Sequence, residues 1–268
     1  MTLQAFIAKQ TANFADAGIA SARLDVLLLL EHAFGQDRAH LLAYPDREIP
    51  SPVLAKLNNK CMQRMRHLPL SYLTNETHFY GRTYYVDEYV LVPRPESERI
   101  ISLLLDLDIP AGTRIADIGT GSGCLGITAA LELHDMRVTL CDKSHGALLV
   151  AQRNAKALGA ACSFAETDLL EGCPLPQDIL LANLPYVPDT YPINKAASHE
   201  PRLALFAGKD GLDMYRLMFQ QIDKLSEKPT HIITEALLEQ HGTLKALAAA
   251  HGYVEVAIDG LAQHFILS

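Results

Sequence analysis

The sequence has no long apolar run and no pair of cysteines in C-x-x-C spacing. Its longest apolar run, residues 26–30, is far shorter than the roughly 20 residues that a membrane-spanning helix needs, so we expect no membrane segment. The five cysteines are an odd number, and no secretion signal precedes them. We therefore expect a reduced, cytoplasmic protein that has neither a disulfide framework nor a metal site.

A general excess of basic residues is also missing. The formal charge is −8 over 268 residues, which argues against stable binding of nucleic acid. One local exception is a stretch without acidic residues in which Lys56, Lys60 and Arg64 are spaced four apart and so share a helix face. This face is either simply solvated or a docking patch for an acidic partner or ribosomal RNA.

The strongest pattern is a glycine-rich turn between a predicted strand and a predicted helix. The apolar stretch 113–118 predicts a buried strand, and residues 125–133 have the composition of a helix. Between them, glycine occupies every second position from Gly119 to Gly123. Glycine permits a sharp turn and a close approach of a ligand, and the free N–H groups of the following helix favour negative charge. The pattern predicts a nucleotide-type cofactor site.

This motif alone leaves the cofactor open. Residues 121–126 read G-x-G-x-x-G, which is the dinucleotide fingerprint. Residues 117–123 read D-x-G-x-G-x-G, which resembles the first motif of Rossmann-like methyltransferases that use S-adenosylmethionine. The residues that follow the other predicted strands must distinguish the two interpretations.

Residues 1–75 predict a small helical domain, because apolar residues recur at helical spacing and no strand-like alternation occurs. Its helices are expected at residues 3–19, 23–34 and 52–67. Residues 76–92 are instead rich in aromatic and β-branched residues around a turn at Gly81-Arg82, which predicts a β-hairpin. We interpret residues 76–95 as a linker between the helical domain and a second domain, residues 96–268.

From residue 113 onward, predicted strands and helices alternate, which indicates a parallel sheet. Strands are expected at residues 113–118, 137–141, 162–166, 178–182, 230–234, 253–258 and 264–267. Helices are expected at residues 125–134, 144–158, 212–225 and 236–250. The last two strands flank Asp259-Gly260, a gap too short for a crossover, so they must form an antiparallel hairpin. The fold class is therefore α/β, a mostly parallel sheet with one antiparallel strand, as in Rossmann-like class I methyltransferases.

Ligands of open α/β sheets bind beyond the carboxyl ends of the strands. Asp142 follows the second strand of this sheet, where a carboxylate can accept hydrogen bonds from both ribose hydroxyls. The alternative role is the N-cap of the next helix, which Ser144 can fill equally well. Asp168 and Leu169 follow the third strand, where they could contact the amino group and the ring of an adenine. An ordinary turn is the alternative there.

The stretch Asn183-Leu-Pro-Tyr186 follows the fourth strand and favours a methyltransferase over a dehydrogenase. A planar amide or amine nitrogen is a poor nucleophile because its lone pair is delocalised. The side-chain carbonyl of Asn183 and the backbone carbonyl of Leu184 can accept its two hydrogens and orient the nitrogen. Pro185 holds Leu184 extended, and Tyr186 can stack on the flat target group. A proline-rich loop with a turn-forming asparagine is the structural alternative.

Together these motifs resemble the protein N5-glutamine methyltransferases of the PrmC/HemK family, which methylate the glutamine of the Gly-Gly-Gln motif in peptide-chain release factors. The resemblance covers nearly the whole chain. Its further landmarks are Pro69-Leu-Ser-Tyr-Leu73, Val92-Pro-Arg-Pro-Glu-Ser-Glu98, Gln152-Arg-Asn154, Glu200-Pro201 and Leu205-Phe-Ala-Gly208-Lys-Asp-Gly211. It implies S-adenosylmethionine as the cofactor and the Gly-Gly-Gln domain of a release factor as the partner. We expect a monomer.

The resemblance also implies roles for individual residues. The residues expected to be catalytic are Asn183, Pro185 and Tyr186. The residues expected to contact the substrate are Asn183, Leu184, Pro185, Tyr186 and Glu200. The residues expected to contact the cofactor are Asp117, Gly119, Thr120, Gly121, Ser122, Gly123, Asp142, Asp168, Leu169 and Asn183.

The sequence departs from the family pattern at two positions. Leu184 replaces the first proline of Asn-Pro-Pro-Tyr, and Leu169 stands where the family often carries an aromatic residue. Asn-Leu-Pro-Tyr is also similar to the motif of the ribosomal RNA adenine dimethylases. Two other substrates stay open, a glutamine of a ribosomal protein and N6 of adenine in RNA or DNA. A non-catalytic binding module of the same fold is a third alternative, which the intact cofactor and substrate motifs oppose.

Overall fold

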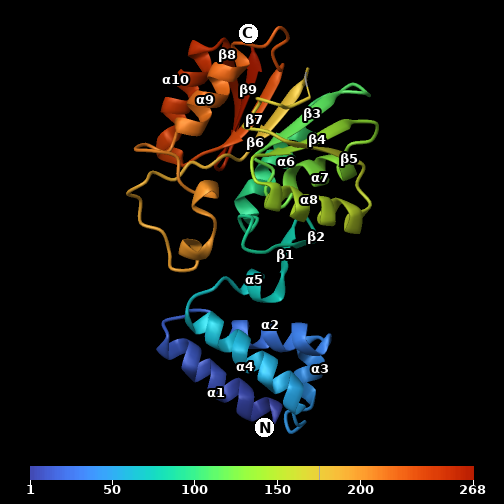
Figure 1. The fold of residues 1–268 in the computed structure, drawn as a ribbon, viewed down its shortest axis with the longest axis vertical. Coiled ribbons are helices and arrows are strands. Elements are labelled where there is room, and N and C mark those ends of the chain that lie inside the picture. Colours follow the sequence, from blue (N-terminus) through green and yellow to red (C-terminus); the bar gives the residue numbers. More distant parts are fainter. Residues whose placement is uncertain (175) are drawn as a thin grey trace. The chain divides into compact units, whose positions relative to one another are not determined.

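The computed structural model describes residues 1–174 and 176–268, and this part of the chain forms two compact units (Figure 1). Unit 1 contains Met1–Asn75 together with Asn194–His199, and unit 2 contains Glu76–Ile193 and Glu200–Ser268. No helix within the described residues is long and apolar enough to cross a membrane.

Unit 1 is helical. Its helices are α1 (Leu3–Asp16), α2 (Ala22–Phe34), α3 (Arg38–Ala43), α4 (Ser51–Met65) and α5 (Leu70–Thr74). Thr2 caps α1 by accepting from the N–H of Ala5, and α2 ends at Gly35 in the left-handed conformation that glycine adopts readily. Apolar side chains from all of these helices share one core. The sequence did not predict α3 and α5, because 6 and 5 residues are too few to show a helical period.

Arg64 does not belong to an exposed basic face. Its Nε donates to Oδ2 of Asp25 at 2.7 Å, and its guanidinium also donates to the carbonyl of Leu68 at 3.1 Å. The side chains of Arg64 and Asp25 are only 12% and 5% exposed. The shared basic face considered from the sequence is therefore corrected: Arg64 ties α4 to α2, whereas Lys56 is exposed.

Among the described residues, unit 2 has a seven-stranded sheet in the order β5-β4-β3-β6-β7-β9-β8. Its strands are β3 (Arg114–Ile118), β4 (Arg137–Asp142), β5 (Cys162–Glu166), β6 (Ile179–Ala182), β7 (His231–Glu235), β8 (Tyr253–Asp259) and β9 (Ala262–Leu267). Neighbouring strands pair in parallel from β5 to β7, and β9 is antiparallel to both β7 and β8. The predicted fold class is confirmed.

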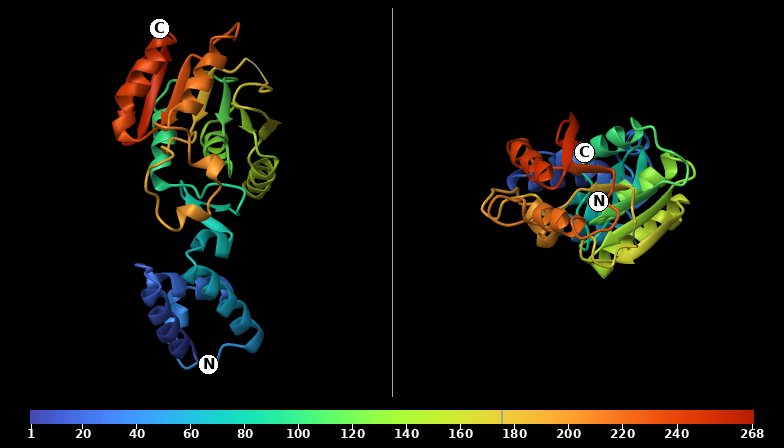
Figure 2. Two further views of the ribbon diagram at one scale, coloured as in Figure 1. Left: turned by 60° about the vertical axis from the view of Figure 1, so that its left-hand side comes forward. Right: turned by 90° about the horizontal axis from the view of Figure 1, so that it is seen from above.

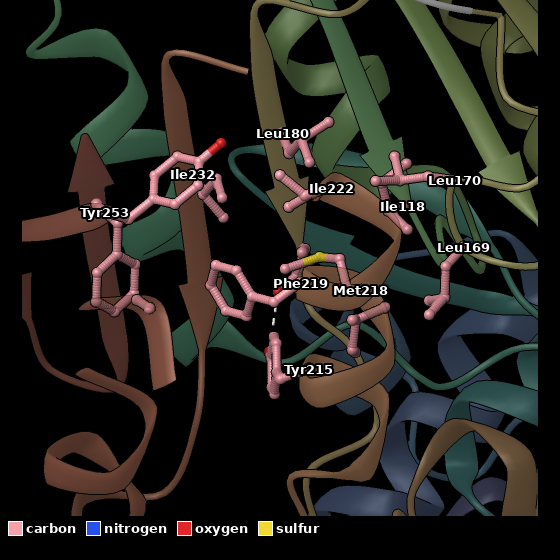
Figure 3. Packing of buried hydrophobic residues seen from close by; sticks show 14 of the residues in the cluster. Ile118, Leu169, Leu170, Leu180, Tyr215, Met218, Phe219, Ile222, Ile232 and Tyr253 are labelled. Atoms are coloured by element: carbon pink, nitrogen blue, oxygen red, sulfur yellow. Dashed lines mark hydrogen bonds between the residues drawn. The ribbon is translucent and has the colours of Figure 1, made fainter. Parts of the chain in front are cut away.

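Helices cover both faces of this sheet (Figure 2). One face carries α6 (Glu98–Leu105), α7 (Cys124–Glu132) and α8 (His145–Leu158), and the other carries α9 (Asp213–Ile222) and α10 (His241–Ala250). Short 3-10 helices are η1 (Pro95–Ser97), η2 (Ala197–His199), η3 (Arg202–Ala204) and η4 (Leu238–Gln240). Figure 3 shows the second face, where Met218 and Phe219 of α9 pack on strand residues such as Ile232. Because both faces are covered, the strand ends are the part of the sheet open to a ligand.

A separate two-stranded hairpin, β1 (Glu76–Phe79) and β2 (Arg82–Tyr85), packs within unit 2 against α8. Its turn falls at Tyr80 and Gly81, one residue earlier than predicted. The second strand ends well before the predicted residue 92, because Asp87 closes a turn. Its carboxylate and carbonyl accept from the N–H groups two and three residues further on, at 3.1 and 3.2 Å.

Candidate active site

A pocket opens in unit 2 at the carboxyl ends of the parallel strands. The loops after β3, β4, β5 and β6 contribute to it, as do residues from the segments 89–97 and 201–214. The predicted site residues that line it are Gly119, Thr120, Gly121, Ser122, Asp142, Asp168, Leu169, Asn183, Leu184 and Pro185. Those outside its lining are Asp117, Gly123, Tyr186 and Glu200.

The turn after β3 contains Gly119, Gly121 and Gly123, and we call it the glycine cradle. Gly119 and Gly123 have φ angles of +70° and +83°, in a region that residues with a Cβ rarely adopt. A Cβ on Gly123 would lie 2.7 Å from the side chain of Ile127, so this glycine is required where the turn meets α7. A Cβ on Gly119 would lie 3.1 Å from Cδ2 of Leu184. The loop after β6 therefore lies directly against the cradle.

Asp117 organises this turn from within the protein. The residue is 1% exposed, and its Oδ2 accepts from the hydroxyl of Thr120 at 2.5 Å and from the N–H of Gly126 at 2.9 Å. Burial raises the pKa of Asp117 to about 6, although these two hydrogen bonds act to lower it. Its Oδ1 is buried and has no hydrogen-bond partner in the described chain.

Asp142 lies at the edge of the same turn. Its Oδ2 accepts from the N–H of Gly121 at 2.9 Å, and its Oδ1 accepts from the N–H of Ser144 at 2.8 Å. Burial raises the pKa of this carboxyl. The side-chain cap of α8 comes from Ser144, which accepts from the N–H of Ala147 at 3.2 Å, so capping does not account for Asp142. The residue lines the pocket, and its carboxylate keeps lone pairs that these two bonds do not use.

The residues after β5 form a turn and the pocket wall at once. The backbones of Asp168 and Glu171 exchange hydrogen bonds of 3.1 Å, and the carboxylate of Asp168 pairs with Lys143 at 2.6 Å on the exposed rim. Leu169 has a φ of +56° and is largely buried, yet it contributes to the pocket lining. The turn thus presents Leu169 as an apolar surface suited to a flat ring.

The loop after β6 brings Asn183, Leu184 and Pro185 to the wall of the pocket. The Nδ2 of Asn183 donates to Oγ of Ser97 at 2.8 Å, so the side-chain carbonyl of Asn183 is left to accept from a ligand. Leu184 is 2% exposed and belongs to the core. The side chain of Leu184 therefore anchors the loop in the core.

Tyr186 anchors the far end of the loop. Its hydroxyl donates to Oε1 of Glu235 at 2.8 Å, and its carbonyl accepts from Nε2 of Gln240 at 2.8 Å. Burial raises the pKa of Tyr186, and the neighbouring Glu235 raises it further. The ring is only partly buried, and stacking on a substrate stays a prediction.

Glu200 braces the pocket from outside its lining. One carboxylate oxygen accepts from Arg94 at 2.5 Å and the other from the N–H of Val92 at 3.1 Å. The residue is 5% exposed. It holds the landmark segment 92–98 against the loop that begins at Pro201, and direct contact with a substrate stays a prediction.

Sequence reasoning did not single out Ser97 or Glu235, although both are bonded to the Asn183–Tyr186 loop. Glu235 ends β7, and an acidic residue at the end of a predicted strand is the same signal that identified Asp142. Ser97 lies inside the Pro-Arg-Pro-Glu-Ser-Glu landmark, where nothing in the residue type distinguishes it.

The sheet with β9 reversed, the glycine cradle and the adjacent Asn-Leu-Pro-Tyr loop define a Rossmann-like methyltransferase. Two families match the chain, the PrmC N-terminal domain at residues 6–74 and the methyltransferase small domain at residues 100–199. The chain is 36% identical to a release factor glutamine methyltransferase of Koribacter versatilis over 83% of this chain and 81% of that protein. It is 34% identical to one of Bacillus anthracis over 87% of both chains. The chain belongs to the family of release factor glutamine methyltransferases, which confirms the resemblance found in the sequence.

Solved structures support the fold. The hMettl16 catalytic domain in complex with MAT2A 3'UTR hairpin 6 has a TM-score of 0.55 at 14% identity, over 81% of this chain and 82% of that chain. A methyltransferase from Pyrococcus furiosus has a TM-score of 0.51 at 16% identity, over 81% of this chain and 97% of that chain. At 14% and 16% identity, these similarities show the fold alone.

Proposed function

We propose that this protein transfers a methyl group from S-adenosylmethionine to the side-chain amide nitrogen, N5, of the glutamine in the Gly-Gly-Gln motif of peptide-chain release factors. The observation that best supports this proposal is the contact between the two loops of the pocket. Leu184, the neighbour of Asn183, lies against Gly119 of the glycine cradle. An amide bound by Asn183 is therefore held beside the place of the methyl donor.

The pocket residues fit S-adenosylmethionine. Gly119 leaves the cradle open, Asp142 can accept from ribose hydroxyls, and Leu169 offers an apolar surface to the adenine. The unused Oδ1 of Asp117 is a buried acceptor that suits an ammonium group. When bound, this cofactor supplies an electrophilic methyl carbon on a positively charged sulfur. The further proposed cofactor contacts are Thr120, Gly121, Ser122, Gly123, Asp168 and Asn183.

Asn183 and Leu184 are proposed to orient the substrate amide. The side-chain carbonyl of Asn183 accepts one hydrogen of the NH₂ group and the backbone carbonyl of Leu184 accepts the other, so the nitrogen lone pair faces the cradle. Pro185 limits the conformations of the loop, and the apolar lining excludes water. In this arrangement the amide nitrogen would be held ready to take the methyl group that the bound cofactor would supply. The N-methylated amide cation is strongly acidic, so it loses its proton without a dedicated base.

Docking and partners belong to the same proposal. We assign docking of the release factor to the N-terminal helical domain, residues 1–75, and catalysis to residues 96–268. The enzyme acts as a monomer in the cytoplasm and does not bind nucleic acid stably, in keeping with its formal charge of −8. Light scattering of the purified chain tests whether it is a monomer. An electrophoretic mobility shift assay with ribosomal RNA tests whether it binds nucleic acid.

The experiment that tests the function is transfer of a radiolabelled methyl group. Release factors, large-subunit ribosomal proteins and naked ribosomal RNA are offered side by side, and the modified residue is mapped by mass spectrometry. We expect label on the glutamine of Gly-Gly-Gln, and no label when that glutamine is replaced by alanine. Label on a ribosomal-protein glutamine or on adenine N6 would contradict the proposal and identify the alternative substrate.

A further inference from the structure

Cys141 and Cys173 bring two thiols into contact next to residues that line the pocket. Their Sγ atoms are 3.4 Å apart, and the thiol of Cys141 donates to the sulfur of Cys173. Cys141 precedes Asp142 at the end of β4, and Cys173 lies in the loop between β5 and β6. Because the sulfurs already touch, a small movement brings them within bonding distance.

The backbones of these two cysteines hold two of the turns that form the pocket. The carbonyl of Cys141 accepts from the N–H of Thr120, in the glycine cradle, at 2.9 Å. The N–H of Cys173 donates to the carbonyl of Leu170 at 3.1 Å, in the turn that carries Leu169. Both Thr120 and Leu169 line the pocket. A covalent bond between the two sulfurs would therefore join two parts of the pocket wall.

The two ends of such a bond are not equally free to move. Cys141 lies in β4, which pairs with β3 on one side and with β5 on the other, so its backbone is fixed from both sides. Cys173 lies outside the strands. Bond formation should therefore draw the turn after β5 toward β4. That turn carries Leu169, the apolar surface that the adenine is proposed to contact.

Exposure and hydrogen bonding give the two thiols different roles. Cys173 is 7% exposed, whereas Cys141 is fully buried. The hydrogen bond from Cys141 lowers the pKa of the Cys173 thiol, and the same bond together with burial raises the pKa of Cys141. The thiolate is the form of cysteine that reacts with oxidants. Cys173 is therefore the thiol that a small oxidant reaches and oxidises first, and Cys141 is the thiol that resolves the product.

We propose that Cys141 and Cys173 form an oxidation site, at which hydrogen peroxide converts the two thiols to a disulfide and thereby weakens binding of S-adenosylmethionine in the pocket. The Cys173 thiolate attacks one peroxide oxygen, the O–O bond breaks and the other oxygen leaves as water, which makes Cys173 a sulfenic acid. The sulfur of Cys141 then attacks the sulfur of Cys173 and displaces a second water. In total the thiols give up two electrons and two protons, and one peroxide becomes two waters.

This inference goes beyond methyl transfer and rests on the proposed function in one respect, namely that the pocket holds S-adenosylmethionine. The test therefore uses no release factor. The purified full chain is treated with hydrogen peroxide, its remaining free thiols are alkylated, and crosslinked peptides are mapped by mass spectrometry. We expect a crosslinked pair of peptides that contain Cys141 and Cys173, and we expect dithiothreitol to separate them.

Calorimetry with S-adenosylhomocysteine measures the effect on the pocket. We expect its Kd to rise about fivefold or more after oxidation, a coupling of ordinary size between two sites. After dithiothreitol the Kd should return to the value of the reduced protein. Reversal by a thiol reductant distinguishes the disulfide from oxidation of methionine, which dithiothreitol does not reduce.

Cys173→Ala distinguishes this pair from the other cysteines. We expect the folded variant to bind S-adenosylhomocysteine like the reduced wild type, both before and after peroxide. Cys162→Ala is the matched control, at a partly buried free cysteine of β5, and it should keep both the crosslink and the loss of affinity. Where thermal unfolding shows that Cys173→Ala does not fold, Cys141→Ala removes the other sulfur and carries the same expectation.

Two results would overturn the inference. One is oxidised wild-type protein that lacks the crosslink between Cys141 and Cys173, or that carries it and binds with an unchanged Kd. The other is an equal, reversible loss of affinity in Cys173→Ala and in the wild type. If the reduced wild-type protein does not bind S-adenosylhomocysteine, the proposed function fails, and the crosslink still decides whether the two thiols form an oxidation site.

Discussion

The side chain of Leu184 lies against Gly119, so that a Cβ on the glycine would be 3.1 Å from Cδ2 of the leucine. Leu184 is also part of the apolar core between the sheet and α9. The family signature has a proline at this position, which stiffens the backbone. In this chain the packing of a buried side chain holds the loop after β6 against the glycine turn after β3 instead.

This relationship predicts the effect of Leu184→Ala. Removing a fully buried leucine side chain should lower the free energy of unfolding by about 2–4 kcal/mol and release the loop from the cradle. We expect weaker binding of S-adenosylmethionine and slower methyl transfer, measured by calorimetry and by radiolabel incorporation. Leu149→Ala, at a leucine that is 54% exposed on α8, is the control and should leave all three quantities near wild type. Unchanged cofactor affinity in Leu184→Ala would contradict the coupling of the two loops.

Asn183→Ala should abolish methyl transfer and leave most cofactor binding intact. The variant removes the carbonyl that accepts from the substrate amide, and loss of one such preorganised group typically lowers kcat by about 100-fold or more. The cofactor retains the cradle and Asp142, so we expect its Kd to change by less than about threefold, which is under 1 kcal/mol. Asn59→Ala, at an exposed position of α4, is the control. Near-full turnover by Asn183→Ala would refute the role assigned to this side chain.

The raised pKa of Asp117 predicts that cofactor binding depends on pH. Its folded-state pKa of about 6 lies above the ordinary 3.8, so the folded protein binds this proton more tightly than the unfolded chain does. The contribution of Asp117 to the free energy of unfolding therefore falls as pH rises from about 4 to above 6. Cofactor affinity should rise over the same range, because an ionised Asp117 attracts an ammonium group.

Asp117→Asn tests both consequences of this pKa. We expect the variant without ligand to gain about 2 kcal/mol in the free energy of unfolding at pH 8, since no charge is then buried. We also expect cofactor binding at least tenfold weaker than wild type, with no change between pH 5 and 7. A pH profile of the Kd that is identical in the two proteins would contradict the assignment of Asp117.

The alternation of strands and helices was readable in the sequence because buried parallel strands are short apolar runs between turn residues. Asp142 was predictable because its place follows directly from the end of such a run. The pairing of Arg64 with Asp25 was not predictable, because 39 residues separate them and only tertiary packing brings them together. The same holds for Ser97 and Asn183, which are 86 residues apart. Local patterns thus predicted loops that line the pocket, whereas the hydrogen bonds that orient its side chains depend on the fold.

Arg64→Ala should destabilise unit 1. The substitution leaves the buried carboxylate of Asp25 without its partner, and loss of one member of such a pair typically lowers the free energy of unfolding by about 3 kcal/mol. Lys56→Ala, on the exposed side of the same helix, should change it by less than about 0.5 kcal/mol. Denaturant unfolding measures both. Equal stability of the two variants would contradict a stabilising role of the ion pair between Arg64 and Asp25.

The paired histidines His231 and His264 predict sensitivity to acid. Their rings are bonded through Nδ1 of His231 and Nε2 of His264 at 3.0 Å, and burial together with His231 lowers the pKa of His264 to about 4. The unfolded chain binds a proton at this histidine near pH 6.5 and the folded protein does not, so the free energy of unfolding falls as pH drops from about 6.5 to 4. In His264→Gln we expect this loss to shrink by on the order of 2 kcal/mol at pH 4, measured by urea unfolding at several pH values. His134→Gln, at an exposed histidine, is the control and should keep the wild-type dependence of the free energy of unfolding on pH. An equal effect of both variants would show that the buried pair is not the source of the acid sensitivity.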